Sequence, residues 1–398
     1  MGSEIYFDNN ATTRVAPEAI EEMQPYLTEL YGNPSSIHGF GSQVARKIQQ
    51  AREHVAALMG VSDPVEVIFT SCGTEGDNAA IRGILESNPK KRHIVTTQVE
   101  HPAVWDFCQH LEKKGYRVTW LGVDEKGTLD LDKLRDSLCD DTALVSVMAA
   151  NNETGVIFPI EDIGKIVKAR GIPFHVDAVQ TAGKIPLNLK DSSVDLLTIS
   201  GHKFHGPKGV GALYIRRGIT FRPFIVGGHQ ERNRRSGTEN VTGIIGMGKA
   251  AELALANLGK ESKKVKALRD RLERLLLASC PGVRVNAHRE KRLPNTSNMS
   301  FEFLEGEAIL VLLDEYRICA STGSACTAGS VEPSHVLRAM QVGPNWIQGT
   351  VRFSLSHYNT EREVDFVAEK MPGILQRLRG LSSLGKVGER QGIGGWPP

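Results

Sequence analysis

Between residues 65 and 177 the sequence alternates between short apolar segments and longer segments with helical periodicity. Short apolar runs that end in polar or glycine residues are typical of buried strands. We predict strands at 67–70, 93–97, 116–121, 143–149 and 172–177, and helices at 44–58, 79–85, 104–114, 130–138 and 160–170. This order indicates an α/β fold with a mainly parallel sheet covered by helices, which binds ligands where the strands end.

After about residue 240 the pattern changes to one long helix followed by mixed elements. We predict helices at 247–277, 305–314 and 360–379, and strands at 283–285, 296–303 and 349–356. These elements indicate a smaller α+β domain, with the long helix as the bridge. The predicted divisions are an N-terminal arm at 1–15 that is part of the small domain, a large domain at 16–255, the small domain at 256–385 and a loose tail at 386–398.

Charge and cysteine spacing argue against several classes of protein. The 398 residues include 48 Lys and Arg against 46 Asp and Glu, so there is no electrostatic case for nucleic acid binding. No apolar run has membrane-spanning length, and the N-terminus begins no signal peptide. The six cysteines are irregularly spaced, without a C-x-x-C pair, which disfavours a disulfide framework or a zinc site. We expect a soluble protein of the reducing cytoplasm.

One lysine is predicted to lie in a tight turn between two strands. Lys203 falls in the Gly-rich segment 200–209, between apolar segments at 194–199 and 210–215. A lysine held there beside hydroxyl and imidazole groups can form a Schiff base with an aldehyde cofactor. The alternative is a solvated loop lysine, so other residues must support the cofactor.

A pyridine-aldehyde cofactor also needs a phosphate site. Gly73 and Thr74 lie between a strand and a helix, where backbone N–H groups can bind phosphate. Ser200 and His202 flank the lysine and can add donors. Thr74 is also compatible with an ordinary helix cap.

Three further residues are candidates for the cofactor ring. Asp177 ends an apolar strand, where a carboxylate is costly unless it is paired, so it can serve as partner of the ring nitrogen. Gln180 follows three residues later and can donate to the phenolic oxygen. His101 follows a strand and can cover the ring face, although a lone histidine is more often a packing residue.

The C-terminal part offers a substrate contact and a nucleophile. Alternation in 351–356 places Arg352 on the polar face of a strand, where it can bind a carboxylate, unless it is a surface arginine. Cys326 lies among the small residues of 321–330, which predict an exposed, flexible loop with an accessible thiol, whether reactive or idle. Cys319 ends a predicted buried strand and is expected to be inert.

These residues belong to motifs that resemble those of the cysteine desulfurases, class V members of the fold-type I pyridoxal-phosphate enzymes. The motifs are YFDNNATT (6–13), FTSCGTE (69–75), EH (100–101), NNETG (151–155), HVDAVQ (175–180), SGHK (200–203), RSGTEN (235–240) and GSAC (323–326). The lysine motif and the cysteine loop are highly specific in combination. The long cysteine loop is similar to that of the branch serving nitrogenase and general iron–sulfur assembly.

The resemblance implies a role for each cofactor residue in the large domain. Lys203 would hold pyridoxal phosphate covalently and later act as acid and base, while His101 would stack on the ring and assist proton transfer. Asp177 would pair with the ring nitrogen and Gln180 with the phenolic oxygen. The phosphate would be held by Thr74, Ser200, His202 and, from the second subunit of a homodimer, Thr238.

The resemblance also implies the reaction. Asn152 and Arg352 would bind the carboxylate of L-cysteine. The Cys326 thiolate would attack the substrate sulfur, leaving a persulfide on Cys326 and yielding L-alanine. The sulfur would pass to an iron–sulfur scaffold protein, with nitrogenase assembly as one destination. Whether Cys326 is also a transient metal ligand, in an iron–sulfur cluster shared with that scaffold, is left open.

Two other classes of function are kept as alternatives. A selenocysteine lyase or another class V enzyme, such as an aminotransferase, would use the same cofactor, but an aminotransferase has no need of a mobile Cys326. A sulfur-carrier hub with vestigial catalysis would not need the intact set of Lys203, Asp177, His101 and Cys326.

Overall fold

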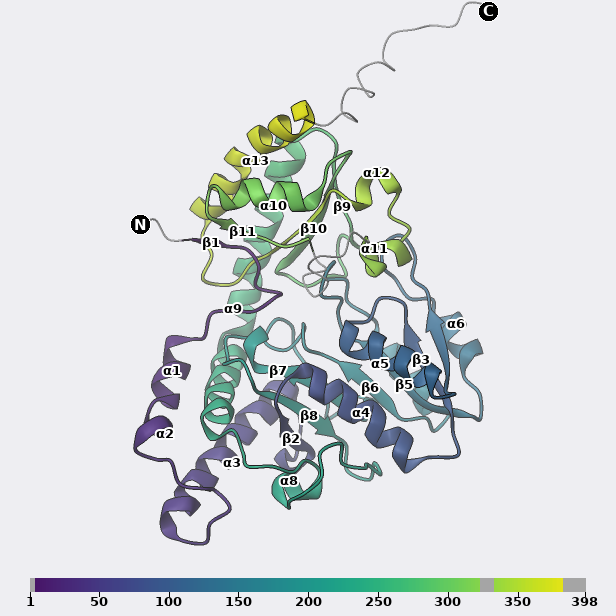
Figure 1. Cartoon of the computed structure of the whole chain (residues 1–398), viewed down its shortest axis with the longest axis vertical. Coiled ribbons are helices and arrows are strands. Elements are labelled where there is room, and N and C mark those ends of the chain that lie inside the picture. Colours follow the sequence, from purple (N-terminus) through teal and green to yellow (C-terminus); the bar gives the residue numbers. More distant parts are fainter. Residues whose placement is uncertain (1–3, 323–332, 382–398) are drawn as a thin grey trace, which may run out of the picture.

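The computed structural model describes residues 4–322 and 333–381 (Figure 1). The main element of these residues is a seven-stranded sheet with the order β2-β8-β7-β6-β5-β3-β4. Its strands are β2 (Val67–Thr70), β3 (His93–Thr97), β4 (Arg117–Leu121), β5 (Thr142–Met148), β6 (Phe174–Asp177), β7 (Leu196–Ser200) and β8 (Gly211–Ile215). Neighbouring strands are parallel except β8, which is antiparallel to both β2 and β7. The predicted mainly parallel sheet is confirmed.

Strand β8 runs antiparallel because a short connection joins it to β7. A parallel crossover needs about a dozen residues or more, and the segment 201–210 is shorter than that. The connection starts with the single turn η2 (Gly201–Lys203) and folds back tightly. A Cβ atom at Gly206 would lie 2.8 Å from the backbone oxygen of Gly201. This close approach requires glycine and places Lys203 in the tight turn expected from the sequence.

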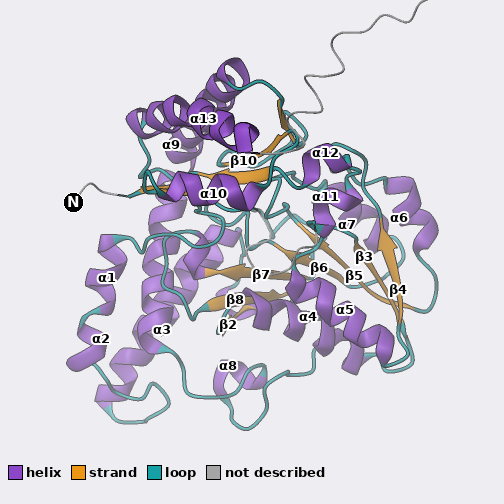
Figure 2. Cartoon of the chain, turned by 45° about the horizontal axis from the view of Figure 1, so that its top comes forward, coloured by secondary structure: helices purple, strands orange, loops and turns teal. Residues whose placement is uncertain are grey.

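Helices cover both faces of the large sheet (Figure 2). One face packs against α4 and α5, and the other against α3, α6, α7 and the first half of α9. These helices are α3 (Gly39–Met59), α4 (Gly73–Ser87), α5 (Pro102–Lys113), α6 (Leu131–Ser137), α7 (Ile160–Lys168) and α9 (Val241–Ser279). Consecutive strand residues alternate between the faces: Ile94 packs with α4 and α5, whereas Val95 belongs to the opposite core. Burial on both faces explains why the inner strands β5 and β7 are largely apolar.

A second group of elements packs around its own core of buried side chains. Its three-stranded antiparallel sheet has the order β12-β10-β9. The strands are β9 (Val283–Val285), β10 (Thr296–Phe301) and β12 (Thr350–Ser354), and the helices that accompany them are α10 (Gly306–Asp314) and α13 (Glu361–Leu381). Strand β10 ends at Phe301, before the predicted 303, because the backbone of Phe303 turns to a φ of 59°.

The N-terminal arm belongs to this second group. Strand β1 (Ile5–Tyr6) pairs in parallel with β11 (Ile318–Cys319), and Phe7 is part of the second core. The arm then runs to the lysine turn, where the Thr13 N–H donates to the backbone oxygen of His202 at 2.9 Å. Residues far apart in sequence therefore meet at Lys203.

Helix α9 connects the two cores (Figure 1). Its Met247 lies in the core of the large sheet and its Leu272 in the second core. The helix begins at Val241, before the predicted 247, because glycines conceal its periodicity. A Cβ atom at Gly248 would lie 2.5 Å from the Cβ of Ala51 in α3, so this glycine lets the two helices approach closely. We propose that the domain boundaries follow the divisions predicted above, with α9 crossing near residue 255.

The remaining helices are short, and the sequence periodicity does not predict them. They are α1 (Pro17–Met23), α2 (Pro25–Thr28), α8 (Gln230–Asn233), α11 (His335–Ala339) and α12 (Pro344–Ile347). Segments of one or two turns show too little of the helical period to be recognised. None of the helices formed by residues 4–322 and 333–381 is both long and apolar enough to cross a membrane.

Candidate active site

Lys203 lies at the end of η2, and its amine points to the N-terminal arm. Nζ donates to the backbone oxygens of Asn10 at 2.6 Å and Ala11 at 2.8 Å. These contacts hold the side chain between the two cores, so the reading of a solvated loop lysine is wrong.

Asp177 ends β6 and is only 5% exposed. One carboxylate oxygen, Oδ1, accepts the backbone N–H of Val179 at 2.9 Å. Burial raises the pKa of Asp177 to about 6, while this hydrogen bond and the nearby Lys203 counteract the rise. A buried carboxyl that ionises near neutral pH is suited to bind a protonated ring nitrogen.

Two more buried acids surround Asp177, and the sequence did not mark either as a functional residue. Asp77 lies on α4, where Oδ1 is 3.5 Å from His175 Nε2 and has no hydrogen-bond partner among the described residues. Burial and the nearby Asp177 raise the pKa of Asp77 well above its usual range. Glu100 follows β3 and is fully buried. Burial disfavours ionisation of each of these carboxyls, and the negative charge of Asp177 adds to the effect.

Glu100→Gln is expected to gain stability relative to the wild type as the pH rises from about 5 to about 8. Burial raises the pKa of Glu100 from 4.5 to about 8, although the Thr97 hydroxyl and the Met148 N–H both donate to its Oε1. Over this window the unfolded chain binds fewer protons than the folded one, so wild-type stability falls with pH until about 8. Glutamine keeps an acceptor for both donors and does not titrate.

Melting temperatures of the two proteins, measured across this pH range, give the size of that gain. A difference between them that stays constant with pH would contradict a protonated Glu100.

Both candidate histidines are held neutral. His101 caps α5, and its Nδ1 accepts the Ala103 N–H at 3.1 Å, which assigns the ring hydrogen to Nε2. Burial, with Lys203 nearby, lowers the pKa of His101 to about 4. His202 Nδ1 lies 3.1 Å from the Thr12 hydroxyl, and burial and Lys203 lower its pKa to about 4 as well. His101 therefore caps helix α5 and also lies near Lys203.

The candidate phosphate site is formed where α4 starts beside the end of β7. A Cβ atom at Gly73 would lie 3.6 Å from the Cβ of Ser200, so this helix start is packed directly against Ser200. Ser200 is 1% exposed, and its hydroxyl has no hydrogen-bond partner among the described residues. Thr74 is exposed in the first turn of α4. A buried hydroxyl without a partner beside a helix N-terminus is suited to an anionic ligand.

Arg352 lies in β12 and is only 2% exposed, so the surface reading of this arginine is wrong. Its guanidinium donates to Asp8 Oδ1 at 2.8 Å and to the backbone oxygen of Asn152 at 3.1 Å. Val351 and Phe353 point into the second core, as the alternation predicts. The guanidinium is thus already bound to one carboxylate, that of Asp8 on the N-terminal arm.

For the other candidate residues the structure gives mainly their burial or exposure. Gln180 is buried, and its Nε2 donates to the Asn10 backbone oxygen at 3.0 Å. Thr238 is exposed. Cys319 lies in β11, and burial raises its pKa, as expected of an unreactive thiol. Cys326 lies outside the described residues. Among the residues that are described, no cluster of three or more His, Cys, Asp or Glu could hold a metal ion.

Comparison with known proteins identifies the family of the chain. Residues 5–367 match the family described as aminotransferase class V. Cysteine desulfurase 1 of Trichormus variabilis is 61% identical over 380 residues, covering 96% of this chain and 95% of that protein. The cysteine desulfurase NifS of Azotobacter vinelandii is 53% identical over 380 residues, covering 96% and 94%.

Among solved structures, a NifS-like protein has the same mixed α/β fold. It is 44% identical, with a TM-score of 0.89, over 94% of this chain and all 100% of the other. The fold class predicted from the sequence is therefore confirmed. Since the family match spans most of the chain and the relatives are similar over nearly their whole length, this chain belongs to the class V aminotransferase family.

Proposed function

We propose that this protein is a cysteine desulfurase, which converts L-cysteine to L-alanine and takes up the sulfur as a persulfide on Cys326. The observation that carries the proposal is that Lys203 and Arg352 both contact the N-terminal arm, with the buried Asp177 near Lys203, in a chain whose relatives bear that name. Neither a selenocysteine lyase nor an aminotransferase is favoured by these relatives.

The side chains of this site match the chemical groups of pyridoxal phosphate. Lys203 offers the amine and Asp177 a buried carboxyl for the ring nitrogen. The unpartnered Ser200 hydroxyl and the start of α4 offer donors for the phosphate, with Thr74 and His202 beside them. When bound, this cofactor supplies an electron-accepting ring that stabilises negative charge developing on the substrate carbons.

The chain's own residues would bind and orient the substrate around that ring. The Arg352 guanidinium would bind the carboxylate of L-cysteine by charge-assisted hydrogen bonds, with Asn152 beside it. Lys203 Nζ would move the proton at the substrate α-carbon. The neutral His101 ring, with its hydrogen on Nε2, would cover the cofactor ring and assist that transfer.

Cys326 would then take the sulfur. Its thiolate would attack the sulfur of the bound substrate and form a new S–S bond, while the substrate C–S bond breaks and leaves its electron pair with the carbon skeleton. Protonation of that skeleton yields L-alanine, and the sulfur remains as a persulfide. The proposed acceptor is an iron–sulfur scaffold protein. In the proposed homodimer, Thr238 would contact the phosphate bound by the other subunit.

Cys326→Ala is expected to bind pyridoxal phosphate normally, while release of alanine and sulfide from L-cysteine falls to near zero because no thiolate remains to accept the sulfur. Mass spectrometry of the wild type after brief exposure to L-cysteine, digested without reductant, should find one added sulfur on the peptide that contains Cys326. Cys319→Ala is the matched control and should keep activity, since its thiol lies in the β11 strand. Full activity in Cys326→Ala, or added sulfur on Cys319, would rule out the proposed nucleophile.

A further inference from the structure

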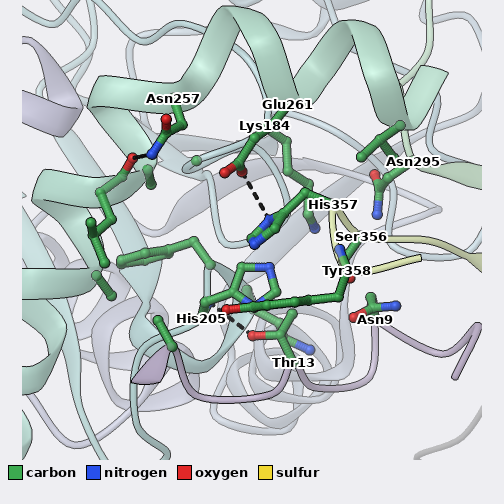
Figure 3. Close-up of a pocket in the computed structure, with 18 of the residues that line it drawn as sticks. Asn9, Thr13, Lys184, His205, Asn257, Glu261, Asn295, Ser356, His357 and Tyr358 are labelled. Carbon is green, nitrogen blue, oxygen red and sulfur yellow. Dashed lines mark hydrogen bonds and ion pairs between the residues drawn. The ribbon is translucent and has the colours of Figure 1, made fainter. Parts of the chain in front are cut away.

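A cavity of about 130 Å³ lies beside Lys203, between the two cores (Figure 3). It is lined by the N-terminal arm, the lysine turn, α9 and the segment after β12. His357 Nδ1 and Glu261 Oε2, which both line it, are 2.9 Å apart. Lys184 also lines the cavity, and nothing above gives this second lysine a role.

Lys184 is hydrogen bonded to a residue of the candidate cofactor site. Its Nζ donates to Gln180 Oε1 at 2.8 Å and lies 3.5 Å from Asn10 Oδ1. Burial lowers the pKa of Lys184 well below its usual range, with Lys203 and Arg352 adding to the effect. A lysine amine donates to a carbonyl oxygen whether or not it is charged. The Gln180 oxygen is therefore turned toward Lys184.

The other half of the Gln180 amide is held from the opposite side. Nε2 donates to the backbone oxygen of Asn10 at 3.0 Å, and the same oxygen accepts Lys203 Nζ at 2.6 Å. A backbone oxygen only accepts, so the NH2 group must face it. The Gln180 NH2 and the Lys203 amine thus converge on one atom, and one N–H of Gln180 stays available there for a ligand.

Asn10 is itself fixed by buried contacts. Its Nδ2 donates to the Thr296 hydroxyl at 2.9 Å, and its Oδ1 accepts Asn295 Nδ2 at 2.9 Å. The acceptor for the NH2 of Gln180 is therefore rigid. Loss of Lys184 would leave the Gln180 oxygen, on a side chain only 6% exposed, without its donor. A buried acceptor that loses its partner favours rotation of the amide.

We propose that Lys184 is a positioning residue of the cofactor site, which holds the Gln180 amide together with the Asn10 backbone oxygen, so that its NH2, not its oxygen, faces the phenolic oxygen of pyridoxal phosphate. The inference depends on the proposed function, because it assigns that cofactor to the site. Lys184 acts only through Gln180 and touches neither cofactor nor substrate.

The test compares Lys184→Met, which removes the donor, with Lys184→Arg, which keeps one. The readouts are the visible absorption bands of the protein loaded with pyridoxal phosphate, without substrate, and the Kd for the cofactor. Loss of the donor should change the relative heights of the visible absorption bands of the bound cofactor, because the phenolic oxygen loses its hydrogen bond. It should also raise the Kd for pyridoxal phosphate about tenfold. Lys184→Arg should restore both values toward those of the wild type.

A double-mutant cycle separates this role from a general effect of charge. In a Gln180→Ala background, Lys184→Met should cause no further change in the bands or in Kd. A wild-type spectrum in Lys184→Met, or the same change with Gln180 already removed, would overturn the proposal. If Lys184→Met does not fold, Lys184→Gln replaces it, because its amide is one bond shorter and does not reach Gln180, and wild-type bands in that variant would count against the role. Failure of the wild type to bind pyridoxal phosphate would instead refute the proposed function.

Discussion

Lys203→Ala is expected to abolish covalent capture of pyridoxal phosphate and to lower desulfurase activity by at least about 10²- to 10⁴-fold, the range for loss of one proton-transferring group. The amine is held by the Asn10 and Ala11 backbone oxygens at the meeting point of the arm and the sheet, which no solvent-exposed lysine can replace. Borohydride reduction of the wild type, followed by digestion and mass spectrometry, should place the cofactor on Lys203.

The matched control is Lys208→Ala. Lys208 is five residues further along the same turn but is exposed, so its removal should leave capture and activity unchanged. Lys184 is the more stringent competitor, because it lies within 3.5 Å of Asn10, the residue that also holds Lys203. A cofactor found on Lys184 or Lys208 in the wild type would refute the central assignment.

Asp177→Asn is expected to lower activity by about 10²- to 10³-fold, as for loss of one group that stabilises charge in a buried site. An amide cannot keep the ring nitrogen of the cofactor protonated, so the ring accepts electrons poorly. Since burial raises the pKa of Asp177 to about 6 in the absence of cofactor, wild-type binding should weaken as the pH falls through about 6 and the carboxylate is lost. Titration of cofactor binding against pH, with and without the substitution, measures this dependence.

Asp77→Asn provides the control for this prediction. The pKa of Asp77 is raised well above its usual range by burial and by Asp177, so an amide replaces a carboxyl that is already neutral. Its effect on cofactor binding should be small. Equal losses in Asp77→Asn and Asp177→Asn would contradict the assignment of the charge to Asp177, as would a wild-type pH profile in Asp177→Asn.

Several site residues could be predicted because their positions follow from local pattern. A lysine in a short segment between two apolar runs must lie in the connection between two strands, and Lys203 is found there, in η2 between β7 and β8. Asp177 ends β6 for the same reason. The two-residue alternation of β12 separates Arg352 from Val351 and Phe353, which pack in the second core. The roles of Asn152 and Thr238 came from the resemblance alone, those of Gln180 and Cys326 were also argued from the local pattern, and all four stay predictions.

The sequence by itself determined the order of the sheet strands and of the longer helices and the residues at several strand ends, because periodicity and chain direction are local properties. The tertiary structure alone decided which of these residues are buried and what they touch. The contact of Arg352 with Asp8, the approach of Asp77 to His175, and the network of Lys184, Gln180 and Asn10 join residues from separate elements. Their distances depend on strand order and on close packing such as that of Gly248 against Ala51, which no local pattern encodes.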